Sequence, residues 1–274
     1  MSTTVLAIGI VPYELFALRY ATRIGRRPEF FLGGDPHDEP MAIDYFVWLA
    51  RRPGHVCLID TGFDEAMGRK RRREFLRDPI DSLALLGTTR EEVQDCVITH
   101  FHYDHAGCFD RLPNARLHVQ DREMQYATGR HMAHEVFRAP YEVDDVVGLV
   151  RRVHAGRVQF HDGDARLTDG LSLHHVGGHT MGMQFARVYT KRGWVVVASD
   201  AAHFYEGWRC CRPLPLVFHV GDMVRGFERI RELADSDDHV VPGHDALVTR
   251  IYPAVSPQLE GIAVRLDEPP RLDA

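Results

Sequence analysis

The chain has 274 residues, of which 45% are hydrophobic and 26% are charged, so it is long enough to bury a substantial core. Its formal net charge of -6 argues against a protein that binds nucleic acid, because such a protein needs a broad positive surface. No run approaches the ~18 apolar residues of a transmembrane helix, which argues against a membrane protein. The composition is even and shows no linker, which predicts one domain over residues 1–274.

The amino-terminal residues 5–11 are apolar, but no positive charge precedes them and Pro12 follows them. This pattern predicts a first strand rather than a signal peptide. The cysteines lack the paired spacing of a disulfide framework and indicate a reducing compartment. We therefore expect a cytoplasmic protein. The five cysteines are Cys57, Cys96, Cys108, Cys210 and Cys211.

Short apolar runs rich in valine, isoleucine and aromatic residues predict most of the strands. Several runs are apolar on both faces, so they need helices on one side and a second sheet on the other. Helices are predicted at 144–153 and at 222–234, where Asp222 is the expected N-cap, and a capping box is predicted at Thr89 and Glu92. The predicted strands are 43–50, 56–59, 95–99, 117–119, 171–176, 184–189, 194–198 and 239–241.

Three segments, 12–40, 126–142 and 202–221, are too long and too aromatic for plain connectors. We expect irregular structure that forms the wall of a pocket, and for the first segment a dimer contact is an equal alternative. The basic run 69–73 is expected to be a solvated helix face rather than a phosphate-binding patch, because acidic residues follow it closely.

Seven side chains that can bind metals stand where four of the apolar runs end. Five imidazoles and two carboxylates without a thiolate suit borderline divalent metals such as zinc, manganese, cobalt or iron. One ion rarely takes seven protein ligands, so three ligands on each of two metals and a carboxylate between them is the natural division. Scattered surface histidines would not recur at four strand ends. The seven residues are His100, His102, Asp104, His105, His179, Asp200 and His244.

These motifs resemble the metallo-β-lactamase superfamily over about residues 40 to 250. Within it the chain is most similar to the N-acyl homoserine lactonase branch, whose members act in quorum quenching. The matching segments are Ile59–Gly62, Thr99–Gly107, Gly177–Thr180, Ser199–Ala201 and Val241–Asp245.

The resemblance implies an α/β fold, a four-layer αββα sandwich, with two metal ions, zinc being expected, at the mouth between the sheets. It also implies a homodimer. By the same resemblance one metal is bound by His100, His102 and His179, the other by Asp104, His105 and His244, and Asp200 bridges them.

The chain departs from that branch at one position. The lactonases carry a tyrosine three residues after the bridging aspartate, where it assists the substrate carbonyl, but this chain has His203 there and Tyr205 two residues later. Either side chain could supply the hydrogen bond, or neither, and an imidazole could also polarise a carbonyl or protonate a leaving alkoxide.

The expected function is the opening of a small cyclic ester, a lactone such as an N-acyl homoserine lactone, by a metal-bridging hydroxide. Asp104 is expected to carry a proton to the leaving group as well as to bind metal. Other hydrolases of the same fold remain alternatives, acting on thioesters as in glyoxalase II, on cyclic amides or on phosphodiesters. A sensor that binds metals without turnover is a further alternative from a different class.

Overall fold

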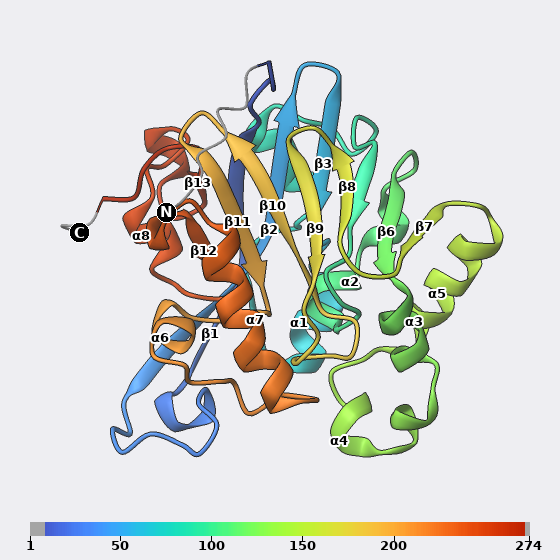
Figure 1. Cartoon of the computed structure of the whole chain (residues 1–274), viewed down its shortest axis with the longest axis vertical. Helices are drawn as coiled ribbons and strands as arrows, with labels where there is room; N and C mark the ends of the chain where they lie inside the picture. Colours follow the sequence, from blue (N-terminus) through green and yellow to red (C-terminus); the bar gives the residue numbers. More distant parts are fainter. Residues whose placement is uncertain (1–8, 272–274) are drawn as a thin grey trace.

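The structure, a computed structural model, describes residues 9–271 and is shown in Figure 1. Within that range, no helix has both the length and the apolar character that a membrane crossing requires. The strand predicted at 5–11 lies mostly outside the described residues, and residues 9–11 are not in a strand.

The larger of two sheets has the order β13-β1-β2-β3-β5-β6-β7, with β4 paired to β1. Antiparallel pairing joins β13, β1, β2 and β3, whereas β3, β5, β6 and β7 are parallel, so the last four strands end at the same edge. The strands are β1 (Glu14–Arg26), β2 (Pro40–Arg52), β3 (His55–Ile59), β4 (Glu74–Phe75), β5 (Asp95–Val97), β6 (Arg116–Gln120), β7 (Val158–His161) and β13 (Ala263–Arg265).

The smaller sheet has the order β12-β11-β10-β9-β8. Its pairs are antiparallel except for β11 and β12, which run parallel and therefore end side by side. The strands are β8 (Ala165–Thr168), β9 (Leu171–His175), β10 (Gln184–Thr190), β11 (Gly193–Ser199) and β12 (Val240–Pro242).

Helices cover the outer faces of both sheets. In Figure 1, α7 lies in front of the smaller sheet, and its Met223 and Phe227 pack against Phe185 of β10. The other α-helices are mostly short. They are α1 (Glu65–Arg71), α2 (Tyr103–Ala106), α3 (Asp121–Ala127), α4 (Glu135–Arg138), α5 (Val143–His154), α6 (Tyr205–Arg209), α7 (Val220–Leu233) and α8 (Val248–Ile251), with short 3₁₀ helices at Arg27–Glu29, Asp81–Leu86, Phe109–Arg111, Arg130–Ala133, Asp237–His239 and Pro257–Leu259.

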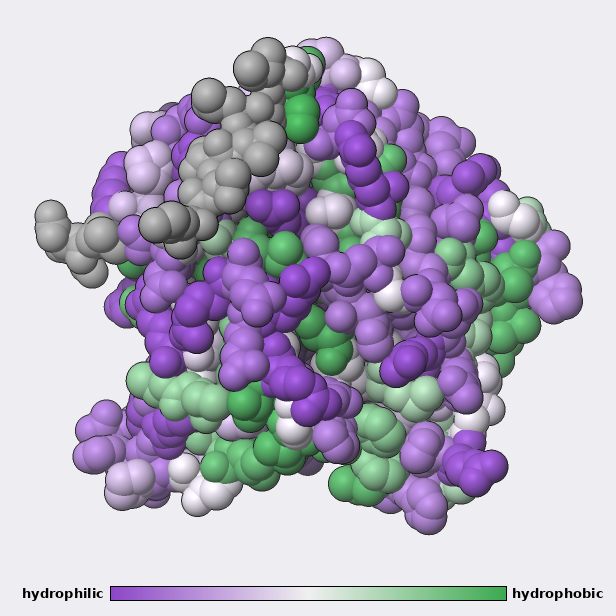
Figure 2. All heavy atoms as spheres, in the orientation of Figure 1, coloured by the Kyte–Doolittle hydropathy of each residue, from purple (hydrophilic) through white to green (hydrophobic). Residues whose placement is uncertain are grey.

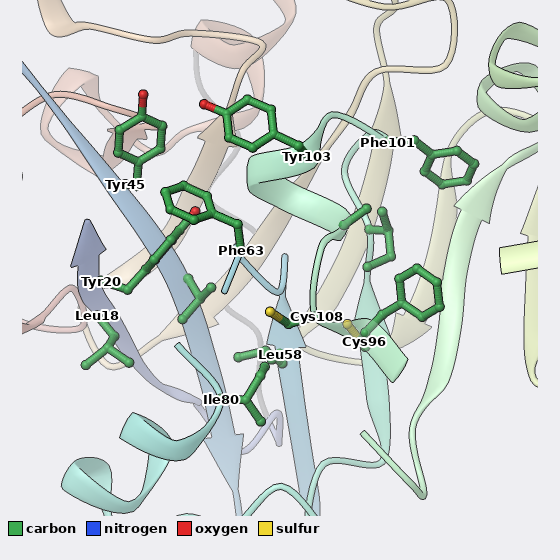
Figure 3. Close-up of a cluster of buried hydrophobic side chains, with 14 of the residues drawn as sticks. Leu18, Tyr20, Tyr45, Leu58, Phe63, Ile80, Cys96, Phe101, Tyr103 and Cys108 are labelled. Carbon is green, nitrogen blue, oxygen red and sulfur yellow. The ribbon is translucent and has the colours of Figure 1, made fainter. Parts of the chain in front are cut away.

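Two cores flank the larger sheet. Trp48 and Ile59 face the smaller sheet and pack with Leu173 and Val197, which fills the space between the sheets. On the opposite face, Figure 3 shows a second cluster that includes Leu58, Phe63 and Cys96. The central strands β2, β3 and β5 are mostly buried on both faces, and the resulting αββα order confirms the predicted sandwich.

Strand β1 corrects the prediction of irregular structure at 12–40. Leu15 and Ala17 face the core between the sheets, whereas Phe16 and Leu18 face the outer core, so apolar residues follow one another without alternation. Such a run carries no two-residue period. Phe30 and Phe31, which follow the strand, are buried as well.

The helix caps also differ from the prediction. The N-cap of α7 is His219, whose Nδ1 accepts a hydrogen bond from the Asp222 N–H (3.0 Å), so Asp222 lies inside the first turn. The Thr89 N–H donates to Glu92 Oε2 (2.7 Å), which is one of the two hydrogen bonds of a capping box. This bond stabilises only a turn, and no helix follows it. The helix predicted at 144–153 is present as α5.

Candidate metal centre

The seven predicted ligands come together at one end of the two sheets. His100 and His102 follow β5, and His179, Asp200 and His244 follow β9, β11 and β12. Asp104 and His105 lie in α2, directly after His102. Two groups, each with donor atoms within 4.8 Å of one another, contain all seven side chains: His100, His102, His179 and Asp200 form one, and Asp104, His105 and His244 form the other.

Asp200 lies between the two groups and presents one oxygen to each. Its Oδ2 is 3.1 Å from His179 Nε2 and 3.6 Å from His100 Nε2. Its Oδ1 is 2.9 Å from His244 Nε2 and 3.3 Å from His105 Nε2. This is the arrangement that a carboxylate bridging two cations requires.

Unpartnered donor atoms test whether the site fits a metal. His100 Nε2, His105 Nε2 and Asp200 Oδ1 are buried and make no hydrogen bond to the described residues. A buried polar atom without a partner costs about 1–3 kcal/mol, so three in one cluster need an explanation. Because all three are ordinary ligands of divalent metals, bound cations would satisfy them.

Backbone carbonyls orient two of the imidazoles. His179 Nδ1 donates to the carbonyl of Leu216 (2.7 Å), and His244 Nδ1 donates to the carbonyl of Asp44 (2.8 Å). With the proton on Nδ1, each ring offers the Nε2 lone pair to the interior of the cluster.

Asp60 orients the third imidazole and connects the two sheets. Its Oδ2 accepts from His105 Nδ1 (2.7 Å) and from the hydroxyls of Thr99 (2.8 Å) and Ser199 (3.0 Å), while Oδ1 accepts from the Thr99 N–H (2.8 Å). The backbone of Asp60 is left-handed, with φ 59°. The sequence motif contains Asp60, but its role beside a ligand was not predicted.

Glu123 of α3 is a second carboxylate that sequence reasoning missed. Its Oε1 accepts from the Phe101 N–H (3.0 Å) and the Tyr141 hydroxyl (2.8 Å). Its Oε2 accepts from the Thr180 hydroxyl (2.7 Å) and the Gly182 N–H (3.0 Å). One buried side chain therefore fastens the loop after β5 to the loop after β9, and both loops carry predicted ligands.

Two ligand loops approach their neighbours too closely for a side chain. A Cβ at Gly243, beside His244, would lie 2.6 Å from the Ser199 carbonyl oxygen. A Cβ at Gly178, beside His179, would lie 2.5 Å from the backbone nitrogen of Met223, and Gly178 also has a positive φ of 87°. Glycine at these two positions lets the strand ends converge.

Ionisation in the cluster follows from burial and from the charges nearby. Burial, and then the neighbouring imidazoles, hold the pKa of His100 and of His102 well below the ordinary value, so both are neutral. Burial alone would lower the pKa of His105, but the carboxylates of Asp200 and Asp60 raise it well above the ordinary value. The surroundings of His105 therefore favour a positive charge, which a bound cation would supply.

His203 and Tyr205, the two side chains that could take the role of the lactonase tyrosine, occupy different places. His203 lines the cavity, and burial lowers its pKa to about 4, so the imidazole is neutral at neutral pH. Tyr205 instead packs in the core between the sheets and does not line the cavity; burial, and then Tyr252, raise its pKa well above the ordinary value. Of the two side chains that could supply the hydrogen bond to a substrate, only His203 therefore lines the cavity.

A cavity of about 480 Å³ opens in front of the cluster. In the view of Figure 2, apolar side chains lie along the lower edge of the molecule, below the start of α7. The segments 12–40, 126–142 and 202–221 all contribute residues to the wall of the cavity. This confirms the prediction that they form a pocket wall. The lining residues include Arg23, Glu29, Phe30, Ile43, Tyr45, Arg71, Arg73, Tyr103, Ala139, Pro140, Leu214, Pro215 and Leu216.

The basic run 69–73 differs from its prediction. The side chain of Arg69 is 67% exposed, as a solvated helix face requires, but that of Arg71 is only 22% exposed. Arg71 and Arg73 both line the cavity, because the chain turns there through the left-handed residue Arg72 (φ 55°) into β4.

Residues 44–244 match the family model described as the metallo-beta-lactamase superfamily. The αββα fold and the strand-end cluster of imidazoles and carboxylates agree with that match. The chain belongs to the metallo-β-lactamase superfamily.

Similar proteins include lactonases. The chain is 29% identical over 175 residues to the N-acyl homoserine lactonase AttM of Azorhizobium caulinodans, a match that covers 58% of this chain and 61% of that protein. The chain thus spans about three-fifths of the length of the curated relatives that it matches.

Two solved structures share the fold. An N-acyl homoserine lactone hydrolase with the product N-hexanoyl-L-homoserine at its catalytic metal centre has a TM-score of 0.71, 17% identity, and covers 86% of this chain and 94% of its own. AidC, a dizinc quorum-quenching lactonase, has a TM-score of 0.66 and 16% identity, with 86% of this chain and 90% of its own covered.

Proposed function

We propose that the protein is a metal-dependent hydrolase that opens a cyclic ester, a lactone of the N-acyl homoserine type. The observation that carries this proposal is the position of Asp200, with one carboxylate oxygen toward each group of imidazoles. The lactonase activity named for the relatives, and the dizinc centre named for one structural neighbour, support the substrate class and the metal.

The ligands proposed for one metal are His100, His102 and His179, and those for the other are Asp104, His105 and His244, with Asp200 between them. Zinc is the expected ion. Two cations bound there would polarise the ester carbonyl and lower the pKa of water enough to give a hydroxide nucleophile at neutral pH.

Residues of the cavity wall position the ester and move the proton. The neutral imidazole of His203 lines the cavity and holds Asp200 in place by donating a hydrogen bond from Nε2. The carboxylate of Asp104, which also lines the cavity, accepts a proton and returns it to the alkoxide that leaves the opened ring. Water and lactone thereby give one carboxylate and one hydroxyl group.

A substrate panel on metal-analysed protein tests this function. Metal in the purified protein is quantified by mass spectrometry, and the same preparation is then assayed for acid release from N-acyl homoserine lactones. We expect about two ions per chain and lactone turnover that exceeds turnover of a thioester, a cyclic amide and a phosphodiester. Folded protein without stoichiometric metal contradicts the proposal, and a faster thioester or phosphodiester reaction favours the corresponding alternative hydrolase.

The single domain over residues 1–274, the homodimer and the cytoplasmic location stay predictions from the sequence and from the family resemblance.

A further inference from the structure

Three arginines line the cavity, and two of them are paired with carboxylates. Arg23 pairs with Glu29, and Arg71 pairs with Glu142. Arg73 forms no ion pair with a carboxylate of the described residues. Arg73 is therefore the one of these three guanidinium groups that no carboxylate pairs directly, although the charge of Asp104 in the same wall acts on it from a distance.

Arg73 is held rigidly at the cavity wall. Its Nε donates to the Tyr103 hydroxyl (3.0 Å) and its Nη1 donates to the carbonyl of Arg71 (2.7 Å). Its guanidinium carbon lies 5.9 Å from the centre of the Tyr45 ring and 6.0 Å from that of Tyr103. Figure 3 shows these two tyrosines on the same side of the cluster, beyond Phe63.

These contacts leave part of the guanidinium group available. Nη2 makes no hydrogen bond to any residue that the structure describes, although the side chain is half-buried. A half-buried cation without an anionic partner is unfavourable, and a bound anion would offset that cost. Because guanidinium is planar and its donors are fixed, it suits a carboxylate better than a neutral carbonyl.

Arg73 is also close to the proposed reaction centre. It bonds to Tyr103, which lies between His102 and Asp104 in the chain, and all four residues line the same cavity. Phe30 and Leu214 supply apolar surface in this cavity. One ligand could therefore reach both the metal cluster and Arg73 through a hydrocarbon linker.

We propose that Arg73 determines substrate specificity by binding a carboxylate that the substrate carries at a distance from the ester. The preferred substrates are then lactones with an acidic substituent rather than lactones with a purely hydrocarbon acyl chain. This inference rests on the proposed function, because it assigns a substrate class to the same site.

Binding of dicarboxylates to the purified, metal-containing protein tests the role of Arg73 without turnover. Calorimetry would compare the dicarboxylates from succinate to suberate with their monomethyl esters, in which one charge is removed and the chain length is kept. We expect at least one diacid to bind tenfold or more tightly than its monoester. A diacid-to-monoester ratio near one across the whole series overturns the proposal.

Variants connect that ratio to the residue. Arg73→Met should bring the diacid-to-monoester ratio close to one. Arg73→Lys should keep part of the preference for the diacid, because lysine keeps the positive charge but lacks the planar set of donors. Arg69→Met is the matched control, since this exposed arginine of the same run pairs with Glu65 and should leave the ratio unchanged. If Arg73→Met does not fold, the wild-type ratio and Arg73→Lys decide. An unchanged ratio in folded Arg73→Met contradicts the assignment.

Turnover gives a second readout and separates the two proposals. Two homoserine lactones with acyl chains of equal length, one ending in methyl and one in carboxylate, should differ in KM at similar kcat, and Arg73→Met should raise KM for the acidic substrate only. A phosphate-ended substrate shows whether carboxylate or any anion is preferred. Failure to hydrolyse every lactone contradicts the proposed function, whereas the calorimetric ratio still decides the role of Arg73.

Discussion

Asp200 Oδ2 lies 2.9 Å from His203 Nε2, so the carboxylate that faces both groups of imidazoles is also held by the cavity wall. Burial lowers the pKa of His203 to about 4, and the neutral ring therefore has a single proton to donate. When Nε2 donates that proton to Asp200, the orientation of the carboxylate is fixed. The ring also stacks on His244, with 5.4 Å between centroids.

Replacing His203 should lower activity more than it lowers metal content. We expect His203→Gln to reduce kcat/KM by about 10–100-fold, the usual effect of removing a partner that orients a metal ligand. The measurement is lactone turnover together with metal per chain. Tyr205→Phe is the control, because the Tyr205 hydroxyl lies in the core between the sheets, and it should change kcat/KM less than twofold. An equal loss in both variants would show that the assignment of the cavity residue is wrong.

Removing the charge of Asp60 should weaken metal binding at the group that contains His105. We expect Asp60→Asn to lower the affinity for one of the two ions by about 10–100-fold, because the imidazole loses its carboxylate partner. Asparagine tolerates the left-handed backbone at this position, so the substitution adds little strain. Metal retained per chain is measured after dialysis against graded chelator. Wild type and Asp169→Asn, which changes an exposed carboxylate, should retain both ions. Full retention by Asp60→Asn argues against a role of Asp60 in orienting His105.

The ligand cluster could be predicted because its signal is local in the sequence. His100, His102 and Asp104 directly follow a short apolar run, and His244 follows another, so each position can be inferred from a few neighbouring residues. Strand ends at one edge of a sheet then bring these positions together.

The supporting residues could not be predicted, because their partners are distant. Glu123 contacts residues as far away as Gly182, and Asp60 contacts Ser199, so nothing adjacent in the sequence marks either carboxylate. Arg73 was assigned to a solvated face for the same reason: its position depends on the left-handed turn at Arg72 and on pairing of β4 with β1.

Neutralising Glu123 should destabilise the fold around the site. Glu123→Gln keeps the shape, but its amide nitrogen would face donors that now bond to Oε1 or Oε2. Hydrogen bonds to a charged group contribute about 1.5–3 kcal/mol each, so we expect the free energy of unfolding to fall by about 2–3 kcal/mol. Urea denaturation measures this change. Glu135→Gln, at a side chain that is 82% exposed, is the control and should have little effect; an equal change in both variants contradicts the role of Glu123.

Asp145 of α5 is a half-buried acid away from the metal centre. It lines a separate cavity of about 520 Å³, and its Oδ2 has no hydrogen-bond partner among the described residues. Burial, followed by the charges of Glu142 and Asp110, raises its pKa from 3.8 to about 7. Between these two values the unfolded chain releases the proton and the folded chain keeps it, so the free energy of unfolding falls as pH rises through this window.

Asp145→Asn should therefore become more stable than wild type as pH increases. We expect the difference in the free energy of unfolding to grow from pH 5 to pH 7 and then to level off at about 1–2 kcal/mol, an amount reduced for solvent screening of a partly exposed group. Urea unfolding at several pH values measures the difference. Asp162→Asn changes an exposed carboxylate that does not line this cavity and should show no such trend. A difference for Asp145→Asn that does not vary with pH would mean that the carboxyl group ionises alike in the folded and unfolded chains.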